Sequence, residues 1–275
     1  QREVEASFFL AAAYGFQGRL YSSEERKSWR KAAVVGKNAL KHMSEIRGKE
    51  ELSVELLFGE GLYNYFSVWV AENYFLLRPV VALFPKGDKE LGIKQLQEVS
   101  YNAFYTRTEA MVFLMRILNS YENDRAGAFY ISEYLHQTYP DNPYFHRYYA
   151  RMLYSMGRFS RARPVCEDIL QRIDMGMTGY EATSGRYAGF FLGQIYENLR
   201  EYDKAKIYYE RTIQFAREIE ADDSGYYHYS LLALGDIAKR DGDKSEAKRY
   251  YNQVKDEAKR KDRVHELARN RLKEM

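Results

Sequence analysis

The chain has 275 residues, of which 45% are hydrophobic, so it can bury a core and is not expected to be disordered. Its formal net charge is only +3, from 42 basic and 39 acidic residues, which does not favour nucleic acid as a partner. With 26 Tyr and 15 Phe but only 5 Pro, the composition favours amphipathic helices over a loop-rich or β-rich chain.

The single cysteine, Cys166, has no partner for an internal disulfide or a CxxC site, and we expect it to be a small core residue. The chain starts at Gln1 rather than Met, and no apolar leader follows. We therefore expect a periplasmic or secreted location after loss of an export signal, with a cytoplasmic location as the alternative.

Residues 1–48 are predicted to form an N-terminal helical hairpin. The stretch "FFLAAAYGF" places small residues on one helical face. The second helix is expected to open with Ser23 as its N-cap and to carry small residues at helical spacing, namely Ala32, Gly36 and Ala39.

Residues 49–102 contain the most apolar stretch, "GEGLYNYFSVWVAENYFLLRPVVALFPKGDKE". Helical spacing predicts a first helix with Leu57, Gly61 and Tyr65, and a second helix with Gly92, Leu96 and Val99. The two helices form one irregular repeat, split by an apolar insertion at 70–87.

Arg78 and Pro79 interrupt this insertion, so its apolar run stays below the roughly 20 residues that a membrane span needs. We expect the insertion to pack against the array, either as a core plug or as a docking surface. Asp88 is the predicted N-cap of the returning helix.

Residues 103–258 repeat a pattern of small and large side chains. Three windows, starting at Tyr144, Tyr187 and Tyr229, superimpose. Small residues recur in both helices of each unit, because two antiparallel helices approach closely only where a side chain lacks bulk. The aligned positions are Ala150, Gly193 and Gly235 in the first helices, with Ala162, Ala205, Ala247 and then Cys166, Tyr209, Tyr251 in the second helices.

Short turns at Gly157, Arg200-Glu201 and Asp241-Gly242-Asp243 are predicted to separate the paired helices. Residues 259–275 are expected to form a charged capping helix whose apolar positions include Val264, Leu267 and Leu272.

The middle unit resembles the tetratricopeptide repeat most closely, through Leu192-Gly193, Tyr196, Tyr202, Ala205 and Tyr209. The resemblance implies an all-α, right-handed superhelix of about six antiparallel helical hairpins, a single TPR-like α-solenoid domain over residues 1–275 with a C-terminal capping helix.

No catalytic or metal-binding constellation is visible in the sequence. The five histidines are scattered without an HExxH pair, so we predict no metal, no cofactor and no enzymatic activity.

The resemblance also implies that the first helices line a concave groove. The groove-facing positions that it implies are Tyr144, Arg147, Arg151, Tyr154, Tyr187, Gln194, Glu197, Asn198, Tyr229 and Asp236. Tyr and Arg are frequent interface anchors, and Arg147 and Arg151, one turn apart, suit a carboxylate or another anion.

We therefore expect a non-enzymatic scaffold that binds a peptide or protein segment in this groove. Two alternatives remain open: a small-molecule or glycan-binding protein that uses the tyrosines, and a structural repeat protein that self-associates.

Overall fold

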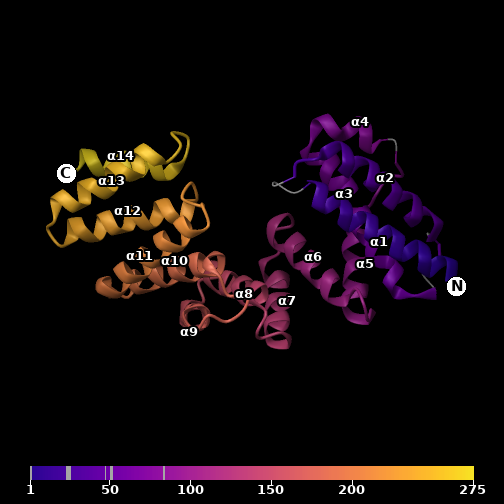
Figure 1. Ribbon diagram of the computed structural model, residues 1–275, viewed down its shortest axis with the longest axis horizontal. Helices are drawn as coiled ribbons and strands as arrows, with labels where there is room; N and C mark the ends of the chain where they lie inside the picture. Colours follow the sequence, from indigo (N-terminus) through magenta and orange to yellow (C-terminus); the bar gives the residue numbers. More distant parts are fainter. Residues whose placement is uncertain (1, 23–25, 47, 50–51, 83) are drawn as a thin grey trace. The chain divides into compact units, whose positions relative to one another are not determined.

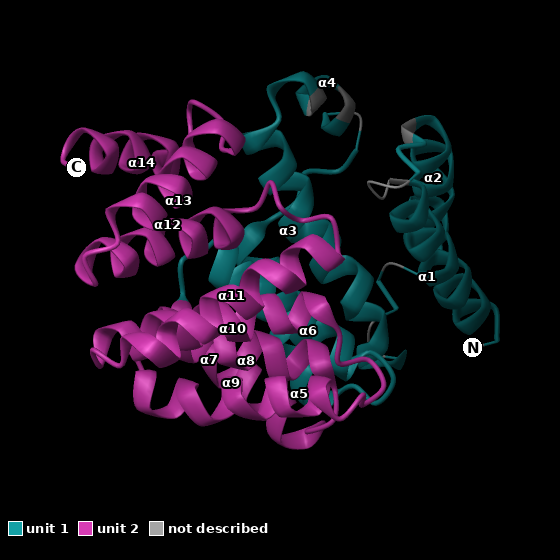
Figure 2. Ribbon diagram, turned by 60° about the vertical axis from the view of Figure 1, so that its left-hand side comes forward, with its two compact units in different colours: residues 1–124 teal, residues 125–275 magenta. Residues whose placement is uncertain are grey.

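The computed structural model describes residues 2–22, 26–46, 48–49, 52–82 and 84–275, and throughout these ranges the regular structure is helical, without strands (Figure 1). The chain divides into two compact units, Gln1–Asp124 (unit 1) and Arg125–Met275 (unit 2) (Figure 2). Consecutive packed helical hairpins build the fold, which confirms the predicted all-α, TPR-like class. Over the described ranges, no helix has the length and apolarity to cross a membrane.

Among its described residues, unit 1 contains two helical hairpins, one further long helix and three short helical segments. Its elements are α1 (Arg2–Ser22), α2 (Trp29–Ile46), η2 (Val54–Leu56), α3 (Leu57–Asn73), η3 (Phe75–Leu77), α4 (Arg78–Val81), α5 (Lys89–Asn102) and α6 (Arg107–Ser120). Helices α1 and α2 pack together as the predicted N-terminal hairpin. The predicted N-cap Ser23 lies outside the described residues.

Helices α3 and α5 form the second hairpin, and glycines mark their closest approach. A Cβ atom at Gly92 would lie 2.7 Å from both the carbonyl oxygen of Gly61 and the backbone nitrogen of Tyr65. The two backbones therefore meet at this point, as the small-residue spacing predicts. The predicted N-cap is also present, since Asp88 Oδ1 accepts a hydrogen bond of 3.0 Å from the backbone N–H of Leu91.

The predicted insertion at 70–87 begins inside α3, which continues through Asn73. Beyond it, η3 and α4 form a short excursion before α5 begins. The side chains of Phe75 and Leu76 are exposed, so they do not plug a core.

Unit 2 contains the regular hairpins. Its helices are α7 (Arg125–Thr138), α8 (Pro143–Ser155), α9 (Phe159–Asp174), α10 (Ala182–Asn198), α11 (Tyr202–Glu218), α12 (Gly225–Arg240), α13 (Lys244–Glu257) and α14 (Arg263–Lys273). The pairs α8/α9, α10/α11 and α12/α13 match the three aligned windows of the sequence, and α14 packs on α12 and α13 as the expected cap.

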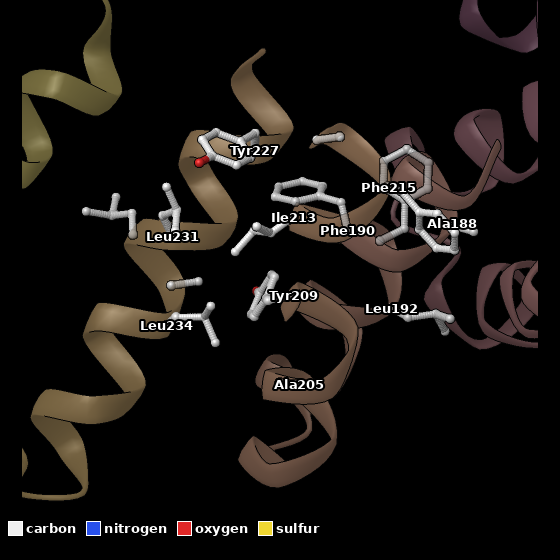
Figure 3. Packing of buried hydrophobic residues seen from close by; sticks show 14 of the residues in the cluster. Ala188, Phe190, Leu192, Ala205, Tyr209, Ile213, Phe215, Tyr227, Leu231 and Leu234 are labelled. Carbon is white, nitrogen blue, oxygen red and sulfur yellow. The ribbon is translucent and has the colours of Figure 1, made fainter. Parts of the chain in front are cut away.

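In two of these hairpins a tyrosine of the second helix packs directly on a glycine of the first. A Cβ atom at Gly193 would lie 2.5 Å from the Tyr209 ring, and one at Gly235 would lie 2.5 Å from the Tyr251 ring. Both tyrosines are fully buried. Figure 3 shows side chains of α10, α11 and α12, Tyr209 among them, gathered in one apolar cluster. The small-large pattern is therefore the packing pattern of the core.

The turns after the first helices adopt the left-handed conformation. Gly157 and Gly242 have φ values of +69° and +87°, and Arg200, at the matching position of the middle hairpin, has φ +61°. Glycine adopts this region freely, whereas a residue with a Cβ atom is strained there. The predicted turn positions are therefore confirmed, and Arg200 is a strained member of the series.

Two histidines meet where α7 packs on α8, and His146 is buried whereas His136 is half-buried. The rings of His136 and His146 stack with their centroids 4.5 Å apart, and His146 Nδ1 lies 3.1 Å from the Tyr180 hydroxyl. Burial lowers the pKa of His136 and lowers that of His146 to about 4, although the nearby Asp168 carboxylate opposes the effect. Both rings are consequently neutral at pH 7.

Cys166 is fully buried in the unit 2 core, as predicted. Burial raises the pKa of its thiol, so the thiolate that would react or bind a metal is disfavoured.

Candidate functional site

The residues predicted to line the groove all lie on α8, α10 and α12, the first helices of the three regular hairpins. Several of them meet in one group of arginine and tyrosine side chains. We call this group the arginine–tyrosine cluster, and it consists of Tyr144, Arg147, Arg151, Arg186, Tyr187 and Tyr226.

Arg147 is held in place on two sides. Its guanidinium carbon lies 5.6 Å from the centroid of the Tyr144 ring and 5.8 Å from that of the Tyr187 ring. Its Nη1 donates a hydrogen bond of 2.9 Å to Ser184 Oγ. Burial lowers the pKa of this guanidinium, but arginine stays charged in proteins. Arg147 therefore presents a positive charge that its neighbours have already oriented.

Arg151 and Arg186 bring two further cations to the same place. The Arg151 guanidinium carbon lies 6.0 Å from the centroid of the Tyr148 ring. The charges of both arginines oppose the rise in the pKa of Tyr226 that burial causes. Arg186 also lies over the Tyr187 and Tyr226 rings, at 5.6 and 6.0 Å. Its Nε atom is buried and has no hydrogen-bond partner among the described residues.

No carboxylate among the described residues forms an ion pair with any of these three arginines. Elsewhere in unit 2, Arg161, Arg172 and Arg211 all pair with acidic side chains. The cluster therefore combines three positive charges with aromatic rings, and no ion pair with a described carboxylate neutralises these charges.

Aromatic rings extend the cluster along the first helices. Tyr154 stacks on Phe191 with ring centroids 4.2 Å apart, and Phe191 contacts the rings of Tyr187 and Tyr226. Burial, with smaller contributions from Tyr226 and Glu197, raises the pKa of Tyr154. The result is a partly buried aromatic surface beside the three cations.

Three other predicted groove residues have hydrogen-bond partners in the hairpin cores. Gln194 Nε2 donates to the Tyr209 hydroxyl at 2.6 Å, and that hydroxyl donates to Glu197 Oε2 at 2.5 Å. In the next hairpin Asp236 accepts from the Tyr251 hydroxyl, at 2.8 Å, and pairs with Arg271. These polar groups satisfy the hydroxyl groups of buried tyrosines.

The last two predicted positions lie apart from the cluster contacts. Asn198, the last residue of α10, is exposed, and Tyr229 is half-buried against the apolar core of unit 2.

Sequence reasoning missed Arg186 and Tyr226. Arg186 directly precedes Tyr187, and Tyr226 lies one helical turn before Tyr229, so both were adjacent to predicted positions. The aligned windows start at Tyr187 and Tyr229, about one turn after α10 and α12 begin at Ala182 and Gly225. They therefore do not include these two residues.

Unit 1 contains a separate cavity of about 1020 Å³. Its lining is mainly apolar, from side chains such as Phe8, Phe16, Met43, Phe58 and Phe113. None of the predicted groove residues contributes to it.

Residues 187–256, which cover most of α10 through α13, match the family model described as tetratricopeptide repeat. This chain is similar to tetratricopeptide repeats over that segment. No curated protein matches it. Tetratricopeptide repeats generally mediate protein–protein interactions, and the matched segment includes Tyr187 and Tyr226 of the arginine–tyrosine cluster.

Proposed function

We propose that this tetratricopeptide-repeat protein is a non-enzymatic scaffold that binds an acidic protein segment at the arginine–tyrosine cluster. The observation that carries the proposal is the set of three guanidinium groups, each next to a tyrosine ring and each without an ion-pair partner among the described residues. An aspartate or glutamate side chain supplies the missing charge.

The chemistry of arginine favours this type of ligand. A guanidinium group binds a carboxylate with two parallel hydrogen bonds, and these are stronger than bonds between neutral groups. Arg147 is already fixed by Tyr144, Tyr187 and Ser184, so binding costs little side-chain entropy. The adjoining rings of Tyr154 and Phe191 provide apolar area for the rest of the segment.

Peptide binding measured by fluorescence polarisation tests the proposal. The probe is a labelled peptide that alternates Glu with apolar residues, and the reference is the same peptide with Gln in place of Glu. We expect the Glu peptide to bind at least tenfold more tightly, because a charge-assisted hydrogen bond contributes about 1.5–3 kcal/mol.

Arg151→Glu reverses an exposed charge of the cluster, and Arg163→Glu is its matched control on the second helix α9. We expect Arg151→Glu to weaken binding of the Glu peptide at least tenfold and Arg163→Glu to leave it within about twofold. Equal losses in the two variants, or equal affinity of the wild-type chain for the Glu and Gln peptides, would contradict the proposed site.

A further inference from the structure

The excursion between α3 and α5 exposes large apolar side chains. We call residues 74–87 the apolar segment. Within it, the side chains of Phe75 and Leu76 are 73% and 84% exposed, and Tyr74 and Phe84 are also exposed. Exposed apolar side chains mark an interaction surface when several of them form an extended patch.

The C-terminal end of the apolar segment is fixed to helix α3 of unit 1. The Tyr63 hydroxyl donates a hydrogen bond of 2.5 Å to the carbonyl oxygen of Pro85. Gly87 lies so close to α3 that a Cβ atom there would be 2.1 Å from Ser67 Oγ and 2.6 Å from the Asn64 carbonyl oxygen. The exposed residues are therefore presented from a fixed base.

A second contact holds the N-terminal half of the segment. Arg78 Nε donates a hydrogen bond of 2.8 Å to the carbonyl oxygen of Ala71 in α3. The Arg78 guanidinium also lies 5.8 Å from the centroid of the Phe75 ring. At the end of α3, the Trp69 and Tyr74 rings meet edge to face at 5.7 Å. Trp and Tyr are the side chains enriched at membrane–water boundaries.

The charges of the apolar segment all have one sign. Residues 74–87 include the basic residues Arg78 and Lys86 but no Asp or Glu. The preceding acid, Glu72, is neutralised by an ion pair of 2.7 Å with Lys89. Protein segments that lie in the headgroup region of an anionic bilayer combine exposed apolar side chains with flanking aromatic and basic residues. The apolar segment has all three features.

We propose that the apolar segment inserts Phe75 and Leu76 into the headgroup–acyl boundary of an anionic lipid surface, with Arg78 and Lys86 at the level of the lipid phosphates. The segment lies on the membrane and does not span it. This site is in unit 1 and is independent of peptide binding at the arginine–tyrosine cluster in unit 2.

The test is co-sedimentation of the full chain with vesicles, either phosphatidylcholine alone or phosphatidylcholine mixed with phosphatidylglycerol. The variant Phe75→Ser/Leu76→Ser removes the inserted side chains. Phe104→Ser/Tyr105→Ser is a matched control, because this adjacent pair in the turn after α5 is also 83% and 77% exposed. All four side chains are exposed, so we expect both variants to keep the helical circular dichroism spectrum.

We expect the wild-type chain to bind the mixed vesicles and Phe75→Ser/Leu76→Ser to bind them at least tenfold more weakly, since burial of one Leu or Phe is worth about tenfold or more. The Phe104→Ser/Tyr105→Ser control should bind as wild type. No binding by the wild-type chain would overturn the proposal. Equal binding by the two double variants would do so as well.

The exposed Lys86 provides an electrostatic test. One basic residue near an anionic surface is worth roughly fivefold in binding, so Lys86→Glu should reduce binding to the mixed vesicles by at least that factor. It should change binding to pure phosphatidylcholine much less. An unchanged preference for phosphatidylglycerol in Lys86→Glu would refute the proposed role of the basic residues.

Discussion

Gly193→Ala tests directly whether the repeat depends on close approach of its two helices. The new Cβ atom would lie 2.5 Å from Cε1 and 2.6 Å from Cδ1 of the Tyr209 ring. Non-bonded carbon atoms pack at about 3.5–4.0 Å, so the ring or the backbone must shift by about 1 Å. Tyr209 is fully buried, and hydrogen bonds to Gln194 and Glu197 fix its hydroxyl, so the ring has little freedom to move.

The expected loss of stability follows from two opposing effects. Overpacking of a core costs about 1–3 kcal/mol, and the fixed ring places this site near the upper value. Alanine is better than glycine inside a helix by about 1 kcal/mol, which offsets part of the cost. We therefore expect Gly193→Ala to lower the free energy of unfolding by about 2 kcal/mol. Gly225→Ala is the control, because the nearest atom to its added Cβ, on Tyr229, is 4.0 Å away.

Urea unfolding followed by far-ultraviolet circular dichroism measures the effect. With a denaturant dependence of about 2 kcal/mol per molar urea, the midpoint of Gly193→Ala should fall by about 1 M. In a Tyr209→Leu background the same substitution should cost much less, because the opposing ring is gone. Equal stability of Gly193→Ala and Gly225→Ala, or an equal cost of Gly193→Ala in both backgrounds, would contradict a close approach of the two helices at this position.

Three further predictions concern unit 2. Arg200→Gly should raise the free energy of unfolding by about 0.5–1 kcal/mol, measured by urea unfolding, because it relieves the left-handed φ of +61°. Tyr209→Phe should cost about 2–3 kcal/mol in the same assay, and Tyr251→Phe only about 1 kcal/mol, because Arg271 still pairs with the acceptor of the Tyr251 hydroxyl. Acid should destabilise unit 2 through His146. The pKa of this histidine is about 4 in the folded chain and about 6.5 in the unfolded chain, so the unfolded chain binds the proton first as the pH falls. Stability should fall by about 3 kcal/mol as the pH drops from 6.5 to 4, and thermal melts should show a smaller fall in His146→Gln.

Each of these expectations has a clear contrary result. Arg200→Ala keeps the strain and is the control for Arg200→Gly, so equal stability of the two would remove the backbone explanation. Equal costs for the two Tyr→Phe variants would show that Arg271 does not compensate for the lost hydroxyl. An unchanged acid slope in His146→Gln would assign the pH dependence to other groups.

The sequence was informative where packing is local and periodic. The small residues at Gly193 and Gly235, the second-helix tyrosines, the turn positions and the Asp88 cap could all be read from spacing. A helix places residues three and four apart on one face, so a repeated requirement for close approach leaves a repeated pattern in the sequence.

The candidate site was predicted only in part, for a physical reason. Arg147 and Tyr187 were expected, but Arg186 joins them through its contact with Tyr226 of the neighbouring first helix α12. Residues far apart in sequence meet there, and spacing within one helix does not record such contacts. The same limit applies to Gln194 and Asp236. Both were predicted to face the groove, but their polar atoms form hydrogen bonds with the buried tyrosines of the hairpins.

The series of helical hairpins could be predicted from the sequence, because small residues that recur at helical spacing let paired helices approach closely. The three-dimensional packing sets which polar side chains satisfy buried tyrosines and which arginines have no acidic partner among the described residues. It also decided that Phe75 and Leu76 are exposed, although their composition would suit a core. Exposure and charge pairing depend on what surrounds a side chain in space, and that is set by long-range contacts rather than by the local order of residues.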